Sequence, residues 1–203
     1  LLKEIPSIPF HDLSIVFYLF LDKDEHGQMT VLIRNDHLPI WNTDTSELYK
    51  LAIDNTPRLY PPCIRSMASL INDMLFVNGT LIQPSFAAAS PNALNLTDSP
   101  IPLSILTNTS GIFGASAMLY PGVLKEFSKK IGHDLIILPS SVHEVLLLPY
   151  DSTYSFQEMA EMVKDVNEKC VPVEEQLSNQ VYYYSSAQDS IFLGGDPASR
   201  ILS

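Results

Sequence analysis

Hydrophobic residues along the chain form two kinds of pattern, short β-rich runs and stretches with helical spacing. The first run, residues 13–21, consists almost entirely of β-branched, aromatic and leucine residues, and residues 28–34 show a similar bias after a polar loop. Two such runs joined by a polar loop predict a β-hairpin. Further strand-like runs lie at residues 101–106, 112–118, 134–138, 142–148, 181–185 and 190–193.

Segments with apolar residues three and four positions apart predict helices between these runs. Asp44 with Glu47 forms a capping box, as does Ser155 with Glu158, and each pair indicates where a helix begins. Gly132 follows an amphipathic stripe and suits a left-handed helix cap. The predicted helices span residues 45–57, where Pro57 stops or kinks the helix, 64–75, 121–131 and 156–170.

The order of these elements predicts the fold class. Short links join most neighbouring strands, so the strands must run antiparallel. We therefore expect an α+β fold, with a mainly antiparallel sheet and helices covering one face. A single domain is predicted over residues 1–193, followed by a tail at 194–203. Residues 77–100 are rich in Gly, Pro, Asn and Ser, which predicts a long loop or flap within that domain.

The net charge and the cysteines indicate which classes of partner and which cellular compartment suit the chain. The net charge of −11 would repel a phosphate backbone and an anionic membrane surface, so nucleic acid and membrane partners are disfavoured. The apolar run at residues 13–21 spans about half of what a bilayer requires. Cys63 and Cys170 lie far apart without metal-binding spacing, which favours free thiols in a reducing, cytoplasmic environment. No pattern indicates an oligomeric state.

Polar residues interrupt the apolar pattern of residues 136–149, and these residues are the candidates for a catalytic role. The candidates are Ser140, Ser141, His143 and Glu144. In an extended strand, His143 and Glu144 point to opposite faces, whereas Ser141 and His143 share one face at roughly 7 Å. This spacing is loose for a nucleophile and its base. The pattern therefore favours a central strand whose polar start emerges at the end of the sheet.

The candidate binding residues outside this segment are His11, His133 and Asp134. The pairs His133-Asp134 and His143-Glu144 could meet across a hairpin and offer two imidazoles and two carboxylates to one ion. His11 begins the first strand and could lie at the same sheet edge. No histidine pair has the helical spacing of a zinc site, however, so the sequence predicts no metal and no cofactor.

Three segments of the chain resemble a bacterial family of unknown function. They are residues 119–125 (LYPGVLK), residues 137–145 (ILPSSVHEV) and residues 55–59 (NTPRL). The family is domain of unknown function 5688 of anaerobic gut Firmicutes, and the resemblance runs from about Pro9 to Leu193. It implies a bacterial, cytoplasmic protein whose longer members carry a further N-terminal region, with this chain as the C-terminal part. No catalytic role comes with it.

The sequence favours a non-enzymatic binding or regulatory module that holds a protein or peptide partner, because no catalytic set is recognisable. The sheet edge and the loop at residues 77–100 are the predicted contact regions. One alternative is a hydrolase-like enzyme with Ser140 or Ser141 as nucleophile, His143 as base, and Glu144 or Asp134 orienting that base. A small-molecule sensor domain is the other alternative. Whether the protein is an enzyme stays open at this point.

Overall fold

The computed structural model describes residues 2–24, 27–67 and 103–195. The chain forms two compact units, Leu1–Leu59 and Tyr60–Ser203, and each is described by itself. The predicted loop at residues 77–100 and nearly all of the predicted tail lie outside the described residues. The single domain predicted over residues 1–193 stays a prediction.

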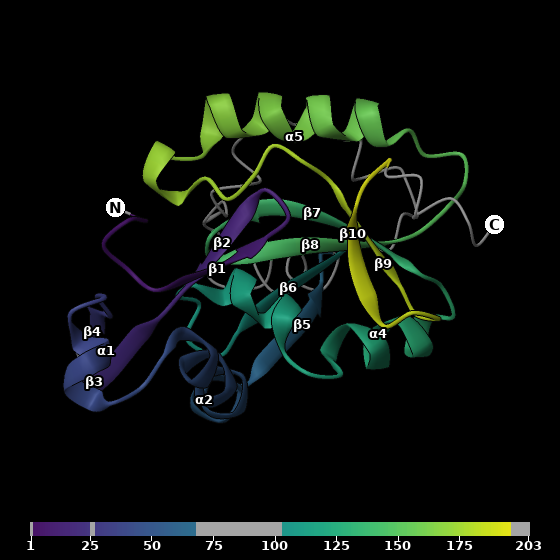
Figure 1. The fold of residues 1–203 in the computed structure, drawn as a ribbon. Coiled ribbons are helices and arrows are strands. Elements are labelled where there is room, and N and C mark those ends of the chain that lie inside the picture. Colours follow the sequence, from purple (N-terminus) through teal and green to yellow (C-terminus); the bar gives the residue numbers. More distant parts are fainter. Residues whose placement is uncertain (1, 25–26, 68–102, 196–203) are drawn as a thin grey trace. The chain divides into compact units, whose positions relative to one another are not determined.

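Two antiparallel hairpins form the strands of the first unit (Figure 1). Strand β1 (Ser7–Phe10) pairs with β2 (Leu13–Val16), and β3 (Tyr18–Asp24) pairs with β4 (Gly27–Leu32). The continuous strand predicted over residues 13–21 is therefore wrong. It is divided at Phe17, whose buried side chain lies where the chain leaves one hairpin and enters the next.

Helices α1 (His37–Trp41) and α2 (Thr45–Leu59) complete the first unit. The backbone N–H of Glu47 donates to the Asp44 carboxylate at 2.8 Å, which confirms the predicted cap. Pro57 does not stop the helix, because it lies in the last turn of α2, near the end of its hydrogen-bonded ladder. Phe17, Ile33 and Leu48 form the buried core of this unit.

The second unit contains a six-stranded sheet in the order β10-β9-β7-β8-β6-β5, and every neighbouring pair is antiparallel. This sheet and the helices confirm the predicted α+β class. The strands are β5 (Pro62–Ser66), β6 (Ser104–Asn108), β7 (Leu135–Ser141), β8 (Glu144–Pro149), β9 (Tyr182–Ser185) and β10 (Ser190–Leu193).

Two predicted elements of the second unit are wrong in type. Residues 62–66, expected as the approach to a helix and its first turn, form strand β5, because they pair along their whole length with β6. The rest of that predicted helix, from residue 68, lies outside the described residues. Residues 114–118, expected within a strand, belong to the 3-10 helix η1 (Gly114–Leu119), which packs against β6 and β8.

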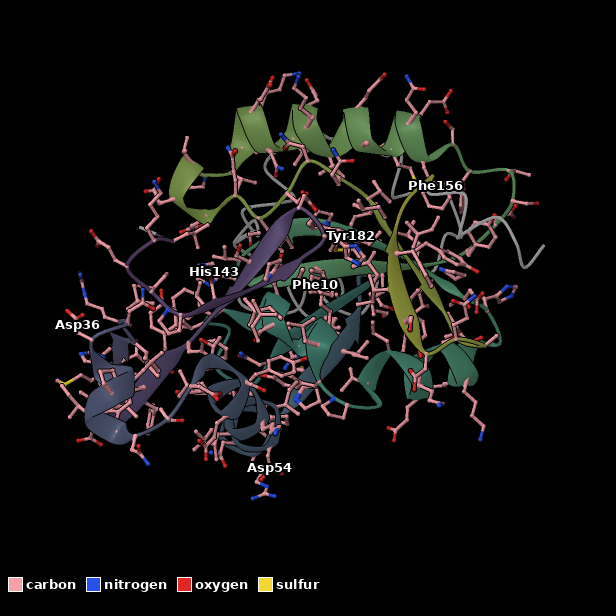
Figure 2. All side chains as sticks on the ribbon, in the orientation of Figure 1. Phe10, Asp36, Asp54, His143, Phe156 and Tyr182 are labelled. Atoms are coloured by element: carbon pink, nitrogen blue, oxygen red, sulfur yellow. The ribbon has the colours of Figure 1, made fainter. Side chains whose placement is uncertain are left out.

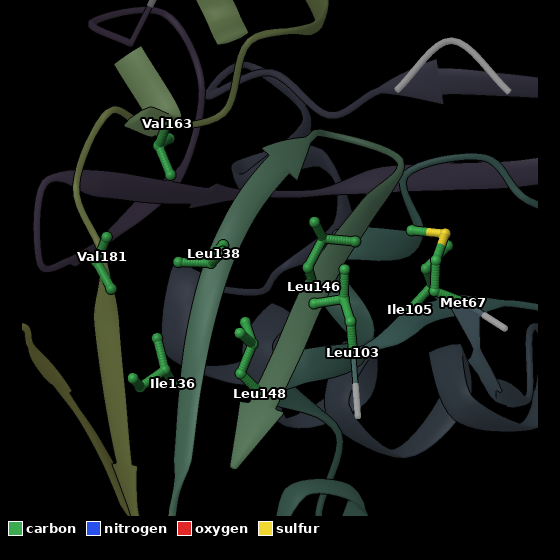
Figure 3. Close-up of a cluster of buried hydrophobic side chains, with 9 residues drawn as sticks. All are labelled: Met67, Leu103, Ile105, Ile136, Leu138, Leu146, Leu148, Val163 and Val181. Atoms are coloured by element: carbon green, nitrogen blue, oxygen red, sulfur yellow. The ribbon is translucent and has the colours of Figure 1, made fainter. Parts of the chain in front are cut away.

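Both faces of the central strands β7 and β8 are buried. Helix α5 (Phe156–Cys170) covers one face, where its Val163 joins the hydrophobic cluster drawn in Figure 3. Helix α4 (Val123–Ile131) and η1 lie on the other side of the sheet (Figure 1), so the helices are not confined to one face as the sequence predicted. The residues that alternate with the cluster along β7 and β8 are fully buried on that side, namely Leu135, Ile137, Val145 and Leu147.

Two predicted helix boundaries in this unit are confirmed, one at the Ser155 cap and one at Gly132. The Ser155 hydroxyl accepts a hydrogen bond from the Glu158 N–H, and α5 begins at the next residue, Phe156. Gly132, with a φ of 78°, donates its N–H to the Ser128 carbonyl and ends α4. Within the described residues, no helix has the length and apolar character needed to cross a bilayer.

The connection from α5 to β9 depends on one buried amide. Asn167 is 2% exposed, and its side-chain amide donates to the Ser178 carbonyl at 3.0 Å and to the Asn179 side chain at 2.8 Å. The Gln176 side chain in turn donates to the backbone carbonyls of Asn167 and Val171. The short 3-10 helix η2 (Val173–Glu175) is thereby held against the end of α5.

We expect Asn167→Ala to lower the free energy of unfolding by about 1–3 kcal/mol, because it removes a buried side chain and its hydrogen bond to the Ser178 carbonyl. Asn179→Ala is the matched control. It removes an exposed acceptor of the same network and should cost less than about 1 kcal/mol. Urea unfolding followed by circular dichroism measures both values. Equal losses in the two variants would contradict the anchoring role of Asn167.

Candidate functional site

The candidate segment forms the tight turn between β7 and β8. Ser141 pairs with Glu144, so Val142 and His143 are the two residues that reverse the chain. Figure 2 shows His143 at one end of the central strands, with Phe156 at the other end. The expectation that the polar residues emerge where a buried central strand begins is confirmed, because β8 is buried from Val145 to Leu148.

Three other segments hold the backbone of this turn. The Ala115 N–H donates to the Val142 carbonyl at 3.2 Å, and the Val142 N–H donates to the Glu175 carbonyl at 2.8 Å. The Thr107 hydroxyl donates to the His143 carbonyl at 2.8 Å. The end of β6, the start of η1 and the end of η2 therefore converge on two residues.

Gly114 shows how closely these segments approach one another. A Cβ at this position would overlap the Thr107 hydroxyl and the His143 carbonyl oxygen, and it would stand 2.9 Å from the Asn108 backbone nitrogen. Two of these three atoms belong to the backbone and could not move aside easily. The packing at the turn thus requires glycine for space.

The His143 side chain makes two contacts that fix its tautomer and its direction. Nδ1 accepts a hydrogen bond from the Phe113 N–H at 3.2 Å, so the proton of the neutral imidazole is on Nε2. Nε2 lies 3.9 Å from the Glu175 carboxylate. The imidazole also stacks on the Phe113 ring, with centroids 6.0 Å apart and planes 18° apart.

Phe113 has an unusual backbone conformation for an aromatic residue. Its φ of 50° lies in the left-handed region, which costs a residue with a Cβ about 1–2 kcal/mol. Hydrogen bonds around it maintain this conformation, since its carbonyl accepts from the Ser116 hydroxyl at 2.8 Å. Phe113 is nevertheless 38% exposed. Strain held in place beside an exposed aromatic ring is a frequent mark of a functional surface.

The two serines and Glu144 interact with other groups of the turn. The Ser141 hydroxyl accepts from the His143 backbone N–H at 3.0 Å, which closes the turn. Ser140 is buried and hydrogen-bonds to Glu144. Burial raises the pKa of Glu144, although His143 and Ser140 oppose that effect. The Ser141 hydroxyl thus contacts the backbone of His143, whereas Nδ1 of its ring accepts from Phe113.

The predicted approach of His133-Asp134 to His143-Glu144 is wrong. Leu135 pairs with Pro149 at one end of the β7–β8 hairpin, whereas Ser141 pairs with Glu144 at the other. The length of β7, about 20 Å, therefore separates the two pairs. Among the residues that the structure describes, no group of three or more His, Cys, Asp or Glu could hold a metal ion.

His11 lies in the turn between β1 and β2, in the first unit. Its φ is 53°, and its ring meets the edge of the Phe10 ring at 4.7 Å. The β1–β2 hairpin is separate from the six-stranded sheet. The expectation that His11 shares a sheet edge with the other candidates is therefore wrong.

Asp134 anchors the β9–β10 hairpin. Its carboxylate accepts from the Tyr183 hydroxyl, from the Ser186 N–H at 2.9 Å and from the Ser186 hydroxyl at 2.5 Å. Partial burial acts to raise the pKa of Asp134, but these hydrogen bonds outweigh burial and the net pKa is lowered. Burial and the Asp134 carboxylate together raise the pKa of Tyr183. These bonds join β7 to β9 and give Asp134 a structural role.

Asp134→Asn should therefore reduce stability in a pH-dependent way. Because the folded state lowers the pKa of Asp134, its contribution is complete above the unfolded pKa of about 4 and disappears as the pH falls through the folded pKa. We expect a loss of about 1–2 kcal/mol at pH 7 that shrinks below about pH 4. Asp165→Asn, at an exposed pair with Lys169, is the control with little effect. Urea unfolding from pH 3 to 7 measures both, and a loss independent of pH would contradict the assignment.

Two residues of this site could not be found from the sequence. Phe113 was part of the strand-like run predicted at residues 112–118, which gave no sign of an exposed ring. Glu175 lies 32 positions after His143 in the sequence, and only its contacts in the fold bring it to the imidazole. The nearest sequence signal was Pro172, which lies just after the end of α5 and just before η2.

No curated protein and no solved structure matches the chain. A family described as a family of unknown function (DUF5688) matches residues 1–186 of the 203-residue chain. This match includes β1 through β9 and the three residues Phe113, His143 and Glu175. The chain therefore belongs to the DUF5688 family of unknown function.

Proposed function

We propose that the protein is a non-enzymatic binding or regulatory module that holds a protein or peptide partner. Its contact site is the surface formed by Phe113, His143 and Glu175, called here the Phe113 surface. The observation that carries the proposal is the strained, exposed Phe113 ring stacked on His143. Exposed aromatic residues on a rigid support are typical anchors of protein interfaces.

The polar chemistry of the turn supports binding over catalysis. The Ser141 hydroxyl and Nδ1 of His143 both accept backbone N–H groups, and Ser140 is buried beside Glu144. These groups stabilise the turn, whereas a nucleophile and its base would have to face each other. In this proposal, the candidate catalytic residues stabilise the turn that supports the Phe113 surface.

The rigidity of the Phe113 surface also supports a binding role. Hydrogen bonds from Thr107, Ala115 and Val142 fix its backbone to the most deeply buried strands of the sheet. A surface that is ordered before binding loses less conformational entropy when a partner arrives. A partner would thus meet the ring, the imidazole and the carboxylate in their final positions.

The proposal places this module in the bacterial cytoplasm, with a partner that is neither nucleic acid nor an anionic membrane. The net charge of −11 supports that choice of partner. Cys63 and Cys170 are both free cysteines, which suits a reducing compartment. The resemblance to Firmicutes proteins supports a bacterial source.

The test compares two exposed aromatic residues. Phe113→Ala should weaken capture of the partner about tenfold or more, as removal of an interface anchor does. Trp41→Ala is the matched control, because Trp41 is 44% exposed but lies in α1 of the first unit. Quantitative mass spectrometry of proteins captured from a bacterial lysate by wild type and by both variants measures the loss. Circular dichroism confirms that each variant is folded.

Two results would overturn the proposal. Loss of the captured protein with Trp41→Ala, and not with Phe113→Ala, would move the contact site to the first unit. A hydrolytic activity of the purified protein on ester or peptide substrates that His143→Gln abolishes would make the protein an enzyme. The expected result is that no such activity depends on His143.

A further inference from the structure

We infer that the Phe113 surface recognises an arginine side chain of its partner, with the guanidinium against the stacked rings of Phe113 and His143 and paired with the Glu175 carboxylate. This inference rests on the proposed function and specifies the chemistry of the partner. It follows from three features of the surface, which are the ring stack, the position of the carboxylate and the charge of the chain.

The ring stack is suited to a planar cation. The two ring planes differ by only 18°, so they offer parallel π surfaces beside each other. Cations are attracted to the faces of aromatic rings, and arginine makes this contact more often than lysine. The hydrogen bond from the Phe113 N–H to Nδ1 fixes the direction of the imidazole beside the Phe113 ring.

The Glu175 carboxylate lies beside this stack and can accept further hydrogen bonds. Its side chain is 43% exposed, and its distance of 3.9 Å from Nε2 of His143 is beyond hydrogen-bond length. The backbone of Glu175 is fixed, because its N–H donates to Pro172 and its carbonyl accepts from Val142. The carboxylate is thus presented to solvent from a rigid support.

Arginine fits these two features together better than lysine does. A guanidinium can stack on an aromatic face while its edge donates two parallel hydrogen bonds to a carboxylate, whereas an ammonium is a compact point charge. The net charge of −11 attracts a basic partner over longer distances. Stacking, pairing and long-range attraction therefore favour the same side chain.

The experiment uses a small probe that contains only the arginine side chain and a blocked backbone. N-acetyl-arginine methylamide is titrated into the full-length ¹⁵N-labelled protein at low salt, and amide shifts are followed by NMR. We expect saturable shifts at the Phe113 and Val142 amides. The citrulline analogue, which has the same shape without the charge, should bind at least about fivefold more weakly.

Two substitutions with the same change in net charge show where the probe binds. Glu175→Gln removes the carboxylate beside His143 and should weaken the probe about fivefold or more. Glu174→Gln is the matched control, because Glu174 is exposed on the same 3-10 helix. It should change the affinity by less than about twofold.

The outcomes separate this inference from the proposed function. Equal binding of the citrulline analogue, or equal weakening by both glutamine variants, would overturn arginine recognition. If the probe fails to bind while partner capture still depends on Phe113, the inference is wrong and the proposed function stands. If the probe binds as expected but capture does not depend on Phe113, the proposed protein partner is wrong.

Discussion

The antiparallel pairing of β7 with β8 is the interaction on which the second unit depends. These strands occupy the centre of the six-stranded sheet, and their apolar residues are buried on both faces. Burial of so many Ile, Leu and Val side chains supplies the main driving force for folding. Because the register of this pair is fixed, its turn at Val142 and His143 has only one possible position. The Phe113 surface is built around that position.

The turn combines the end of a hydrophobic core with a polar surface. Its backbone groups bond to three separate segments, and its imidazole supports the Phe113 ring. The candidate catalytic side chains of the sequence all make contacts within or beside this turn. Ser141 closes the turn, Ser140 is buried with Glu144, and His143 orients an aromatic neighbour. What reaches solvent beside the turn is the Phe113 surface, the proposed contact site.

Local signals allowed much of this fold to be predicted. The cap at Ser155, the glycine at 132 and the long apolar runs of β7 and β8 all act within a few residues of one another. Strand β5 was mistaken for part of a helix because its conformation comes from pairing with β6, a segment about forty positions away in the sequence. The Phe113 surface escaped prediction for the same reason. Its three residues come from the N-cap of η1, the hairpin turn and η2, and only tertiary contacts unite them.

This separation in sequence has a thermodynamic consequence. Phe113, His143 and Glu175 come together only when η1, the β7–β8 turn and the segment after α5 are all in place. An unfolded or partly opened chain lacks the surface, so a ligand of the surface binds the folded state alone. Such a ligand shifts the folding equilibrium by mass action, in proportion to the logarithm of its free concentration over its Kd. A ligand bound to the surface therefore raises the free energy of unfolding, and the size of that rise measures how much of the protein is occupied.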